Sequence, residues 1–504
     1  MIAKLKTLGE WLTLRHGWQR YILLFIAGAL SALAFAPYYL WPILFFTFPY
    51  LLLQMECGTA RQTAFSCFMF GYGFFVAGTY WIAFSLLVDE TQFGWLFPIS
   101  VFGLSAAFAS YFLIKGYLFA KLRSTYRPAN IFLFALLWVA FEYARSAGMF
   151  GFAWNLLGYV SMPSERLSQL ASVTGTFGIS WLIVLCLFPL IYRNRAYIVA
   201  ILALIISAYS YGMWRVPSEA VPVTDTRLRL VQPNIAQEMK WTDAGKDESM
   251  RIHGILTHMQ TDAPMADLVI WSETAFPFTV SDGSGWYHLV RHFAPYGGAF
   301  ITGSIRAHRD KVWNSMMVIN SKGDLLEQYD KHQLVPFGEF VPLRSILPFE
   351  KITPGALDFS RGAGVRTLRI LDIPAFSPLI CYEAVFPWHA AQKSDRPAWL
   401  LNLTNDAWYG DSAGPYQHFD MTRMRAIEQG LPLARVANTG ISALIDPYGR
   451  IVGKLPLNVR GLIDKNLPKQ LSITFYATYG EAPVLIALFL AFMTYILYFI
   501  RRMR

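Results

Sequence analysis

A single cysteine, Cys381, stands alone in a polar stretch that runs from about residue 227 to about residue 467, between two apolar blocks. The other three cysteines, Cys57, Cys67 and Cys186, lie in or beside apolar segments, so no disulfide can form within the polar stretch. A lone thiol in such a domain is a candidate nucleophile, although a buried cysteine is more often inert packing. A catalytic interpretation of Cys381 therefore requires partner groups elsewhere in the stretch.

Two such partners follow strand candidates of the same stretch. Glu273 closes the segment Asp267-Leu-Val-Ile-Trp-Ser-Glu273, and Lys331 follows a predicted hairpin. A buried carboxylate can take the proton of a thiol whose pKa is about 8.5, and a cation can stabilise the oxyanion that forms when the thiolate attacks a carbonyl. A second carboxylate, Glu339, is a candidate for holding Lys331. Because the ends of neighbouring strands can converge at one side of a sheet, these residues predict a site for attack on a carbonyl carbon.

The segments that must position these residues alternate between strands and helices. Turn residues predict hairpins at Lys322-Gly-Asp324 and at Asp446-Pro-Tyr-Gly449. This alternation predicts one layered α/β domain with a single large core. The predicted strands are residues 228–231, 268–271, 300–303, 316–319, 377–381 and 399–403, and the predicted helices are residues 249–260, 285–293 and 420–429.

The remainder of the chain is apolar enough for a membrane. Hydrophobic residues make up 55% of the 504 residues and aromatic residues 16%. A helix that crosses a bilayer needs about 20 mostly apolar residues. About eight segments approach this length, and residues 40–55 and 131–143 are short enough to be re-entrant or tilted. The other six are residues 21–36, 63–87, 94–119, 177–192, 197–211 and 482–500.

Charge orients the predicted α-helical bundle. Basic residues fall at both termini and on every second connection, as at Arg61 and Lys121, whereas the loop after the third span carries Asp89 and Glu90. Basic loops mark the cytoplasmic side, which predicts cytoplasmic termini and places the polar domain outside. The net charge of +10 fits this topology and an anionic lipid surface better than a nucleic-acid partner. We expect a bundle over residues 1–220, a catalytic domain over residues 221–470 and a final helix with a basic tail over residues 471–504.

The sequence motifs around the three reactive residues resemble the nitrilase superfamily, whose members use a Glu-Lys-Cys triad in this chain order. Ser272 stands where many relatives have a proline before the glutamate. The fold that this resemblance implies is an αββα sandwich. The matching motifs are Val231-Gln-Pro-Asn-Ile235, Trp271-Ser-Glu273-Thr, Tyr329-Asp-Lys331-His-Gln-Leu-Val-Pro-Phe-Gly-Glu339, Ile380-Cys381-Tyr-Glu383 and Asn405-Asp-Ala-Trp-Tyr-Gly410.

The whole chain resembles the bacterial apolipoprotein N-acyltransferase family, with further matches at Leu33-Ala-Phe-Ala-Pro37, Trp138-Val-Ala-Phe-Glu-Tyr-Ala-Arg145 and Thr478-Tyr-Gly480. The resemblance implies an inner-membrane enzyme with a periplasmic catalytic domain and no cofactor, and we expect a monomer. Its partners would be a phospholipid acyl donor, a diacylated apolipoprotein acceptor and the lipid bilayer. The acyl chain would pass to the α-amine of the acceptor's N-terminal cysteine.

The resemblance also implies a role for each residue of the centre. Cys381 would form a thioester with the acyl group, and Glu273 would serve in turn as base, acid and base. Lys331 and the backbone N–H of Tyr382 would form the oxyanion hole. The chemistry would thus proceed in two steps through an acyl-enzyme.

Further residues would support this centre. Glu339 would orient Lys331, and Glu383 would shape the pocket together with Tyr382. Lifting an acyl chain into water costs about 0.8 kcal/mol per CH₂, so apolar loops should lead to the thiol. The aromatic residues that would contact lipid, or would simply pack the domain, are Trp241, Phe337 and Phe340.

Other interpretations remain open. A membrane-tethered amidase or thiol hydrolase would let water resolve the acyl-enzyme, and in a papain-like pair His332 or His418 would be the base. A transporter is a weaker interpretation, because the charges cluster in loops and at span ends. Glu142 and Arg145, one turn apart on a predicted helix, either pair with each other or contact a substrate. The histidines show no metal-ligand spacing, so no metal site is expected.

Overall fold

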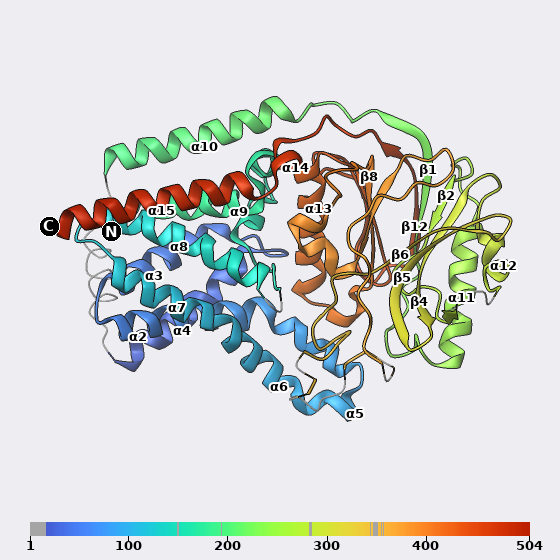
Figure 1. Cartoon of the computed structure of the whole chain (residues 1–504), viewed down its shortest axis with the longest axis horizontal. Coiled ribbons are helices and arrows are strands. Elements are labelled where there is room, and N and C mark those ends of the chain that lie inside the picture. Colours follow the sequence, from blue (N-terminus) through green and yellow to red (C-terminus); the bar gives the residue numbers. More distant parts are fainter. Residues whose placement is uncertain are drawn as a thin grey trace.

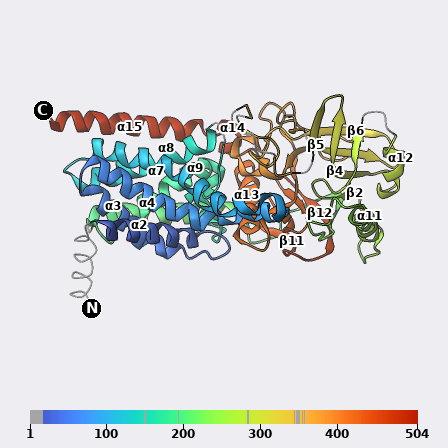
Figure 2. The same cartoon turned by 90° about the horizontal axis from the view of Figure 1, so that it is seen from below.

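The computed structural model describes residues 17–148, 151–192, 194–281, 285–342, 344–345, 351–353, 355 and 357–503. Two parts lie along its long axis, a bundle of helices and a domain built on two β-sheets, as Figure 1 shows. The view from below, in Figure 2, shows the same two parts end to end. The N-terminal basic residues that entered the topology prediction lie outside the described residues, apart from Arg20.

Helices cover all eight apolar segments of the predicted bundle. One of the two short segments is the short helix α3 (Leu44–Glu56), which contains Pro49, and the other is the continuous helix α8 (Arg127–Ala147). Proline cannot donate the backbone hydrogen bond of its own position, so a helix with proline in its interior is weakened there. The remaining helices are α2 (Trp18–Ser31), α4 (Ala60–Thr79), α7 (Ser105–Leu122), α9 (Ala171–Cys186), α10 (Arg195–Arg215) and α15 (Ala482–Met503).

Within the described residues, five helical segments are long and apolar enough to cross a membrane. A shorter apolar segment covers Trp18–Ala34. The prediction of several apolar helices before the polar domain is therefore confirmed. The five segments are Ala60–Leu87, Glu90–Leu122, Leu167–Cys186, Arg195–Arg215 and Ala482–Arg501.

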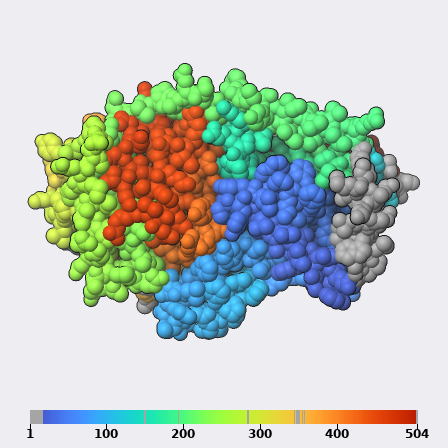
Figure 3. All heavy atoms as spheres, turned by 180° about the vertical axis from the view of Figure 1, so that it is seen from behind, coloured from blue at the N-terminus to red at the C-terminus, as the bar shows by residue number. Residues whose placement is uncertain are grey.

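An arm of short helices leaves the bundle between α4 and α7. It contains the 3₁₀-helix η3 (Tyr80–Leu87), α5 (Glu90–Phe93) and α6 (Phe97–Ile99). Figure 1 shows α5 and α6 at the edge of the bundle nearest the β-sheet domain, and Figure 3 shows this arm in light blue reaching that domain. Phe84 of η3 lies against Gly410, so the arm contacts the segment that follows β8.

The β-sheet domain contains a seven-stranded sheet and a five-stranded sheet. The strand order of the first is β12-β1-β2-β4-β5-β6, with β3 beside β4, and that of the second is β11-β10-β9-β8-β7. Both predicted hairpins are present, as β5–β6 and β10–β11. The strands are β1 (Val223–Gln232), β2 (Leu268–Ile270), β3 (Thr279–Ser281), β4 (Ala299–His308), β5 (Lys311–Asn320), β6 (Leu325–Asp330), β7 (Phe376–Ile380), β8 (Trp399–Thr404), β9 (Leu433–Ala437), β10 (Ser442–Ile445), β11 (Ile451–Leu455) and β12 (Gly461–Pro468).

The two sheets pack face to face and helices cover their outer faces. Apolar side chains of β1, β2 and β4 interdigitate with those of β7, β8 and β9 to form the central core. The helices α11 (Asp243–His258) and α12 (Tyr287–Val290) cover the seven-stranded sheet. The helix α13 (Ala413–Gln429) covers the five-stranded sheet. The layers are helix, sheet, sheet and helix, as the resemblance to the nitrilase superfamily implies.

The helix α13 also joins the domain to the bundle, because nearly all of it is buried. The Glu428 carboxylate accepts hydrogen bonds from Thr176 N and Thr176 Oγ1 at 3.0 and 2.7 Å, and the guanidinium Nε of Arg425 lies 2.8 Å from Glu428. Helix α9 is interrupted at Gly175, whose φ of 62° leaves the N–H groups after it without helical partners. The β-sheet domain thus caps a broken helix of the bundle.

Glu142 and Arg145, which the sequence predicts either to pair with each other or to contact a substrate, have other partners. Glu142 accepts hydrogen bonds from Trp138 Nε1 at 3.0 Å and from Leu157 N at 2.9 Å. Arg145 donates to the carbonyl oxygen of Phe152 at 2.5 Å. Both side chains therefore satisfy groups of the connection that follows α8, since tertiary contacts offer them better partners than each other.

Candidate active site

The candidate nucleophile lies at a sharp turn. Cys381 directly follows β7 and opens the 3₁₀-helix η9 (Cys381–Val385), and its φ of 50° is in the left-handed region. A non-glycine residue pays about 1–3 kcal/mol for this conformation, so the surrounding structure must hold it. Part of that hold comes from Glu383, whose carboxylate accepts a hydrogen bond from Ile380 N at 2.7 Å. A strained backbone therefore holds the thiol in place, and Cys381 is only 5% exposed.

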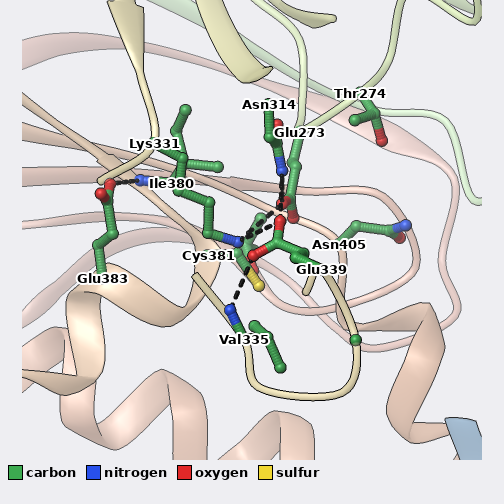
Figure 4. A network of polar contacts seen from close by, with 12 residues as sticks. Glu273, Thr274, Asn314, Lys331, Val335, Glu339, Ile380, Cys381, Glu383 and Asn405 are labelled. Carbon is green, nitrogen blue, oxygen red and sulfur yellow. Dashed lines mark hydrogen bonds and ion pairs between the residues drawn. The ribbon is translucent and has the colours of Figure 1, made fainter. Parts of the chain in front are cut away.

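Two elements of the other sheet bring the predicted base and cation to the same place. Glu273 follows β2, and Lys331 follows β6. Lys331 Nζ lies 3.5 Å from the Glu273 carboxylate and 3.0 Å from the Glu339 carboxylate. Figure 4 shows these three side chains and the Cys381 sulfur pointing toward one another. The structure thus brings the four predicted residues together between the two sheets.

Close packing of the backbone makes this approach possible for Glu273. A Cβ atom at Gly303 of β4 would lie only 2.3 Å from Thr274 N and 2.7 Å from the Glu273 Cα. Gly303 N also donates to the carbonyl oxygen of Ser272 at 3.2 Å. Glycine at this position therefore lets the segment that carries Glu273 lie directly against β4.

The electrostatics of the site require a base. Burial raises the pKa of the Cys381 thiol, and the nearby Glu273 carboxylate raises it further. Burial also raises the pKa of Glu273, against the opposing effect of Lys331. Burial alone would lower the pKa of Lys331, but the carboxylates of Glu339 and Glu273 raise it above its ordinary value. The resting site therefore holds a protonated thiol, a carboxyl suited to proton transfer and a lysine whose charge the two carboxylates stabilise.

Two site residues escaped the sequence analysis. Asn314 of β5 donates from Nδ2 to Glu273 at 2.7 Å and to Glu339 at 3.1 Å, so it bridges the two carboxylates. The sequence could have indicated Asn314 as a site residue, because it is polar and lies opposite Lys331 in the predicted hairpin. Lys240 is 2% exposed and donates to Thr274 Oγ1 at 2.8 Å and to the Glu273 carbonyl oxygen at 3.2 Å. Its local sequence carried no such signal.

Burial lowers the pKa of Lys240 to about 8, with the Glu273 carboxylate acting in the opposite direction. Its contacts fix the backbone on either side of Glu273 and bring a second cation near that carboxylate. Gln237, three residues earlier, accepts a hydrogen bond from Asn405 Nδ2 at 2.8 Å. The segment before α11 is thus fastened at two points beside the site.

Glu383 and Tyr382, two of the predicted supporting residues, contact different parts of the structure. Glu383 is fully buried and accepts hydrogen bonds from Tyr329 OH at 2.9 Å and from His332 N at 2.8 Å, in addition to its bond with Ile380 N. It fastens the segment that carries Lys331 to the segment that carries the thiol. The side chain of Tyr382 turns toward the bundle and donates to the carbonyl oxygen of Gly151 at 2.7 Å.

The three predicted aromatic residues lie in two segments. Trp241 is half-buried and follows Lys240 directly, and its indole Nε1 is buried without a hydrogen-bond partner. Phe337 is 40% exposed and has a φ of 62°, and Phe340 is half-buried beneath the guanidinium of Arg361 at 5.8 Å. Phe337 and Phe340 flank Glu339, so their segment both lines the site and reaches the surface. Their contact with lipid stays a prediction.

The histidines considered as alternative bases have other partners. His332 Nδ1 lies 2.6 Å from the Glu383 carboxylate, and its Nε2 lies 3.1 Å from a nitrogen of His389. His418 of α13 lies nearer the nucleophile, but its Nε2 faces the backbone carbonyl oxygen of Cys381 at 3.2 Å. Arg435 Nη2 can only donate and lies 3.2 Å from the other ring nitrogen, Nδ1, so in the matching tautomer the single ring proton is on Nε2, which donates to this carbonyl and cannot take a proton from the sulfur.

Possible metal ligands also meet at this point. Ligand atoms of Cys381, Asp406 and His418 lie within 4.8 Å of one another. Asp406, however, forms a 2.6 Å ion pair with Arg435, and its other oxygen lies 2.8 Å from His418 Nδ1. Burial would raise the pKa of Asp406, but Arg435 and His418 lower it to about 2. This donor set is therefore already engaged within the protein.

A thiol, a carboxyl and a lysine at the strand ends of an αββα sandwich define a carbon–nitrogen hydrolase domain. The family model described as carbon-nitrogen hydrolase matches residues 228–474, and the model described as apolipoprotein N-acyltransferase N-terminal domain matches residues 27–188. Relatives that are 36% and 37% identical align with 96% of the chain. The chain belongs to the apolipoprotein N-acyltransferase family.

Three proteins named apolipoprotein N-acyltransferase illustrate this relationship. The one from Rhodopseudomonas palustris is 36% identical and the one from Bradyrhizobium diazoefficiens 37% identical, each over 96% of both chains. The one from Rickettsia typhi is 37% identical over 92% of this chain and 95% of its own.

Two of the solved structures that resemble this chain cover about half of it. A carbon-nitrogen hydrolase superfamily protein from Xanthomonas campestris is 21% identical with a TM-score of 0.36, covering 53% of this chain and 97% of that one. A nitrilase-superfamily protein from Saccharomyces cerevisiae is 17% identical with a TM-score of 0.38, covering 50% of this chain and 93% of that one.

Proposed function

We propose that this enzyme transfers an acyl chain from a membrane phospholipid, through a thioester on Cys381, to the α-amine of a diacylated apolipoprotein. The observation that carries the proposal is the meeting of Cys381, Glu273 and Lys331 in a domain that is joined to an apolar helical bundle. Membership of the family supports the same reaction class. A soluble amidase needs no such bundle, whereas an enzyme that acts on acyl chains does.

In the first step, Glu273 takes the thiol proton while the sulfur attacks the ester carbonyl carbon of the phospholipid. The oxyanion that forms is stabilised by Lys331 Nζ and by the backbone N–H of Tyr382. The tetrahedral intermediate collapses, the ester C–O bond breaks, and Glu273 returns its proton to the departing oxygen. The products are a thioester on Cys381 and a lysophospholipid.

In the second step, the α-amine of the acceptor attacks the thioester carbonyl while Glu273 takes an amine proton. The C–S bond then breaks, and the proton passes to the Cys381 sulfur. Glu339 holds Lys331 in place during both steps, supported by the 3.0 Å contact between them. Water must be excluded between the steps, because hydrolysis of the thioester would release a free fatty acid.

We further propose an inner-membrane location with about eight spans, cytoplasmic termini and a periplasmic catalytic domain. Contacts at one end of the bundle support this topology. Arg20 of α2 donates to the carbonyl oxygen of Gln54 in α3 at 2.5 Å, and Tyr495 of α15 donates to the carbonyl oxygen of Leu122 in α7 at 2.6 Å. The start of α2 therefore lies beside the end of α3, and the last turns of α15 lie beside the end of α7, as expected for helices that alternate in direction.

The function is tested by incubating the purified full chain with phospholipid in mixed micelles and a diacylated lipopeptide. Mass spectrometry should detect one added acyl group on the peptide amine. A matched lipopeptide whose α-amine is acetylated should remain unchanged. Release of free fatty acid without any acylated peptide would contradict the proposal and support a membrane-tethered hydrolase.

Replacing Lys240 by methionine should shift the pH dependence of thioester formation. The cation favours the charged form of Glu273, so its removal raises the pKa of the base. Because Glu273 must be deprotonated to accept the thiol proton, the acid limb should move to higher pH, by about one unit, equivalent to about 1.4 kcal/mol. The measurement is the rate of thioester formation between about pH 5 and pH 9.

The matched control is Lys246→Met, because Lys246 is a nearby lysine whose partner Asp243 is exposed. This variant should keep the wild-type pH profile. A purely structural role for Lys240 would lower the rate by the same factor at every pH, and that result would contradict the prediction.

A further inference from the structure

A buried network beneath the nucleophile has no place in the two proton transfers. His418 and Asp406 are 0% and 1% exposed, and Arg435 is 0% exposed. Arg435 donates to Asp406 at 2.6 Å, to Asn402 at 2.5 Å and to Thr422 at 3.0 Å. The network therefore connects α13 with β8 and β9. One of its groups, His418 Nε2, contacts the backbone of Cys381.

That contact determines the direction of a peptide plane. His418 Nε2 donates to the carbonyl oxygen of Cys381 at 3.2 Å. In a trans peptide the C=O and N–H groups lie in one plane and point in opposite directions. Because the carbonyl of Cys381 points toward α13, the N–H of Tyr382 points away from α13. Lys331 and Glu273 come from the facing seven-stranded sheet, on the side away from α13.

The same peptide is the one that needs support. Cys381 has a left-handed φ of 50°, so without external contacts this turn would relax toward a more favourable conformation. Glu383 holds the preceding Ile380 N–H, and His418 holds the following carbonyl. Arg435 Nη2 donates to the other ring nitrogen, Nδ1, at 3.2 Å, and Asp406 lies beside it at 2.8 Å, so the position of the His418 ring does not depend on solvent.

We propose that His418 is a positioning residue that fixes the Cys381–Tyr382 peptide and thereby aims the Tyr382 N–H at the oxyanion of the acyl-transfer reaction. Asp406 and Arg435 hold the His418 ring at the required angle. His418 does not touch the substrate and takes no proton in the reaction. This inference rests on the proposed function, since it assigns a structural origin to one of the two oxyanion donors.

Two reactions of the Cys381 thiol distinguish a positioning role of His418 from a role as a base. Thioester formation from a phospholipid passes through an oxyanion and needs the Tyr382 N–H. Alkylation of Cys381 by iodoacetamide displaces iodide from carbon and forms no oxyanion, although it needs the thiolate. The loss of an oxyanion donor should therefore slow acylation alone, whereas the loss of a base should slow both reactions.

The experiment compares His418→Leu and His418→Gln in the full chain in mixed micelles. His418→Leu should slow thioester formation about 100-fold, the usual cost of losing one oxyanion donor, with iodoacetamide alkylation within about 3-fold of wild type. Glutamine can present an N–H at the position of Nε2, so His418→Gln should recover most of the lost rate. Glu273→Gln, which removes the base, should slow both reactions.

Folding is controlled with His253→Leu, because His253 is equally buried but lies in α11 on the far side of the seven-stranded sheet. The thermal unfolding midpoint of the His253→Leu variant measures how much stability the chain loses with a buried imidazole. Equal losses of acylation and alkylation in His418→Leu, or an unchanged acylation rate, would overturn the proposal. If the wild-type chain forms no thioester but is still alkylated at Cys381, the proposed function fails independently of His418.

Discussion

Replacing Cys381 by alanine is expected to abolish every detectable acyl adduct and all transfer to the lipopeptide. The Cys381 sulfur lies beside Glu273 and Lys331, and alanine leaves these two residues without a nucleophile. The measurement is peptide mapping by mass spectrometry after a brief incubation with phospholipid. In the wild-type chain, the added acyl mass should lie on the peptide that contains Cys381 and should be removed by neutral hydroxylamine, which cleaves thioesters.

The chain offers a matched control for this substitution. Cys57 is an exposed free thiol, so Cys57→Ala tests whether loss of an accessible cysteine has any effect by itself. It should leave the adduct and the transfer rate unchanged. An acyl adduct that persists in Cys381→Ala, or one that disappears in Cys57→Ala, would contradict the assignment.

The same assay reports on the base. Because burial and the Glu273 carboxylate raise the pKa of Cys381, the resting thiol is protonated and waits for a proton acceptor. Glu273→Gln keeps the shape of the side chain but cannot accept a proton, so adduct formation should slow by about 10²–10⁴-fold. In the wild-type chain, the rate should rise with pH as Glu273 loses its proton.

The second large effect is expected for Lys331→Met, which should lower transfer at least about 10³-fold and also destabilise the fold. The substitution removes the cation of the oxyanion hole. It also leaves Glu273 and Glu339 as two buried carboxylates that share one neutral donor, Asn314. Like charges in such a site raise the pKa of one carboxyl, so Glu273 would hold its proton at neutral pH and cease to be a base.

The stability cost of Lys331→Met follows from the same contacts. Removing one partner of a buried ion pair typically costs about 3–5 kcal/mol, because a buried charge is left uncompensated. Thermal unfolding of the purified chain measures this cost. The double variant Lys331→Met with Glu339→Gln removes one of the two remaining carboxylates, so it should regain stability while transfer stays lost.

This double variant separates the two roles of Lys331. If stability does not recover, the charge balance among Lys331, Glu273 and Glu339 is not what destabilises the single variant. Transfer within about 10-fold of wild type in Lys331→Met would remove the lysine from the oxyanion hole. Either result would require a different account of the site.

Much of the architecture could be predicted because its signals are local. The apolar segments, the strand candidates before Glu273 and Cys381 and the turn at Lys322-Gly-Asp324 are each readable within a few residues. The burial of a short apolar run can be predicted without knowing which segments pack against it, and a turn can be predicted from its own residues. The resemblance of the motifs then identified which strand ends carry the chemistry.

The contacts of Asn314, Lys240 and His418 could not be predicted in this way. Their partners lie 25 to 41, 33 to 34 and 12 to 37 residues away in the sequence, and each contact forms only when these remote segments are brought together. The same reason separates Glu142 from Arg145. A helical spacing of three residues permits an ion pair, but the connection after α8 offers buried N–H and C=O groups that must be satisfied.

The chain thus encodes locally which residues are apolar, where strands end and which side chains are reactive. Only the assembled molecule decides which of these reactive groups meet, how their charges alter one another, and which way the peptide after Cys381 faces. Distance and desolvation set these properties, and both arise from contacts between segments that are remote in sequence.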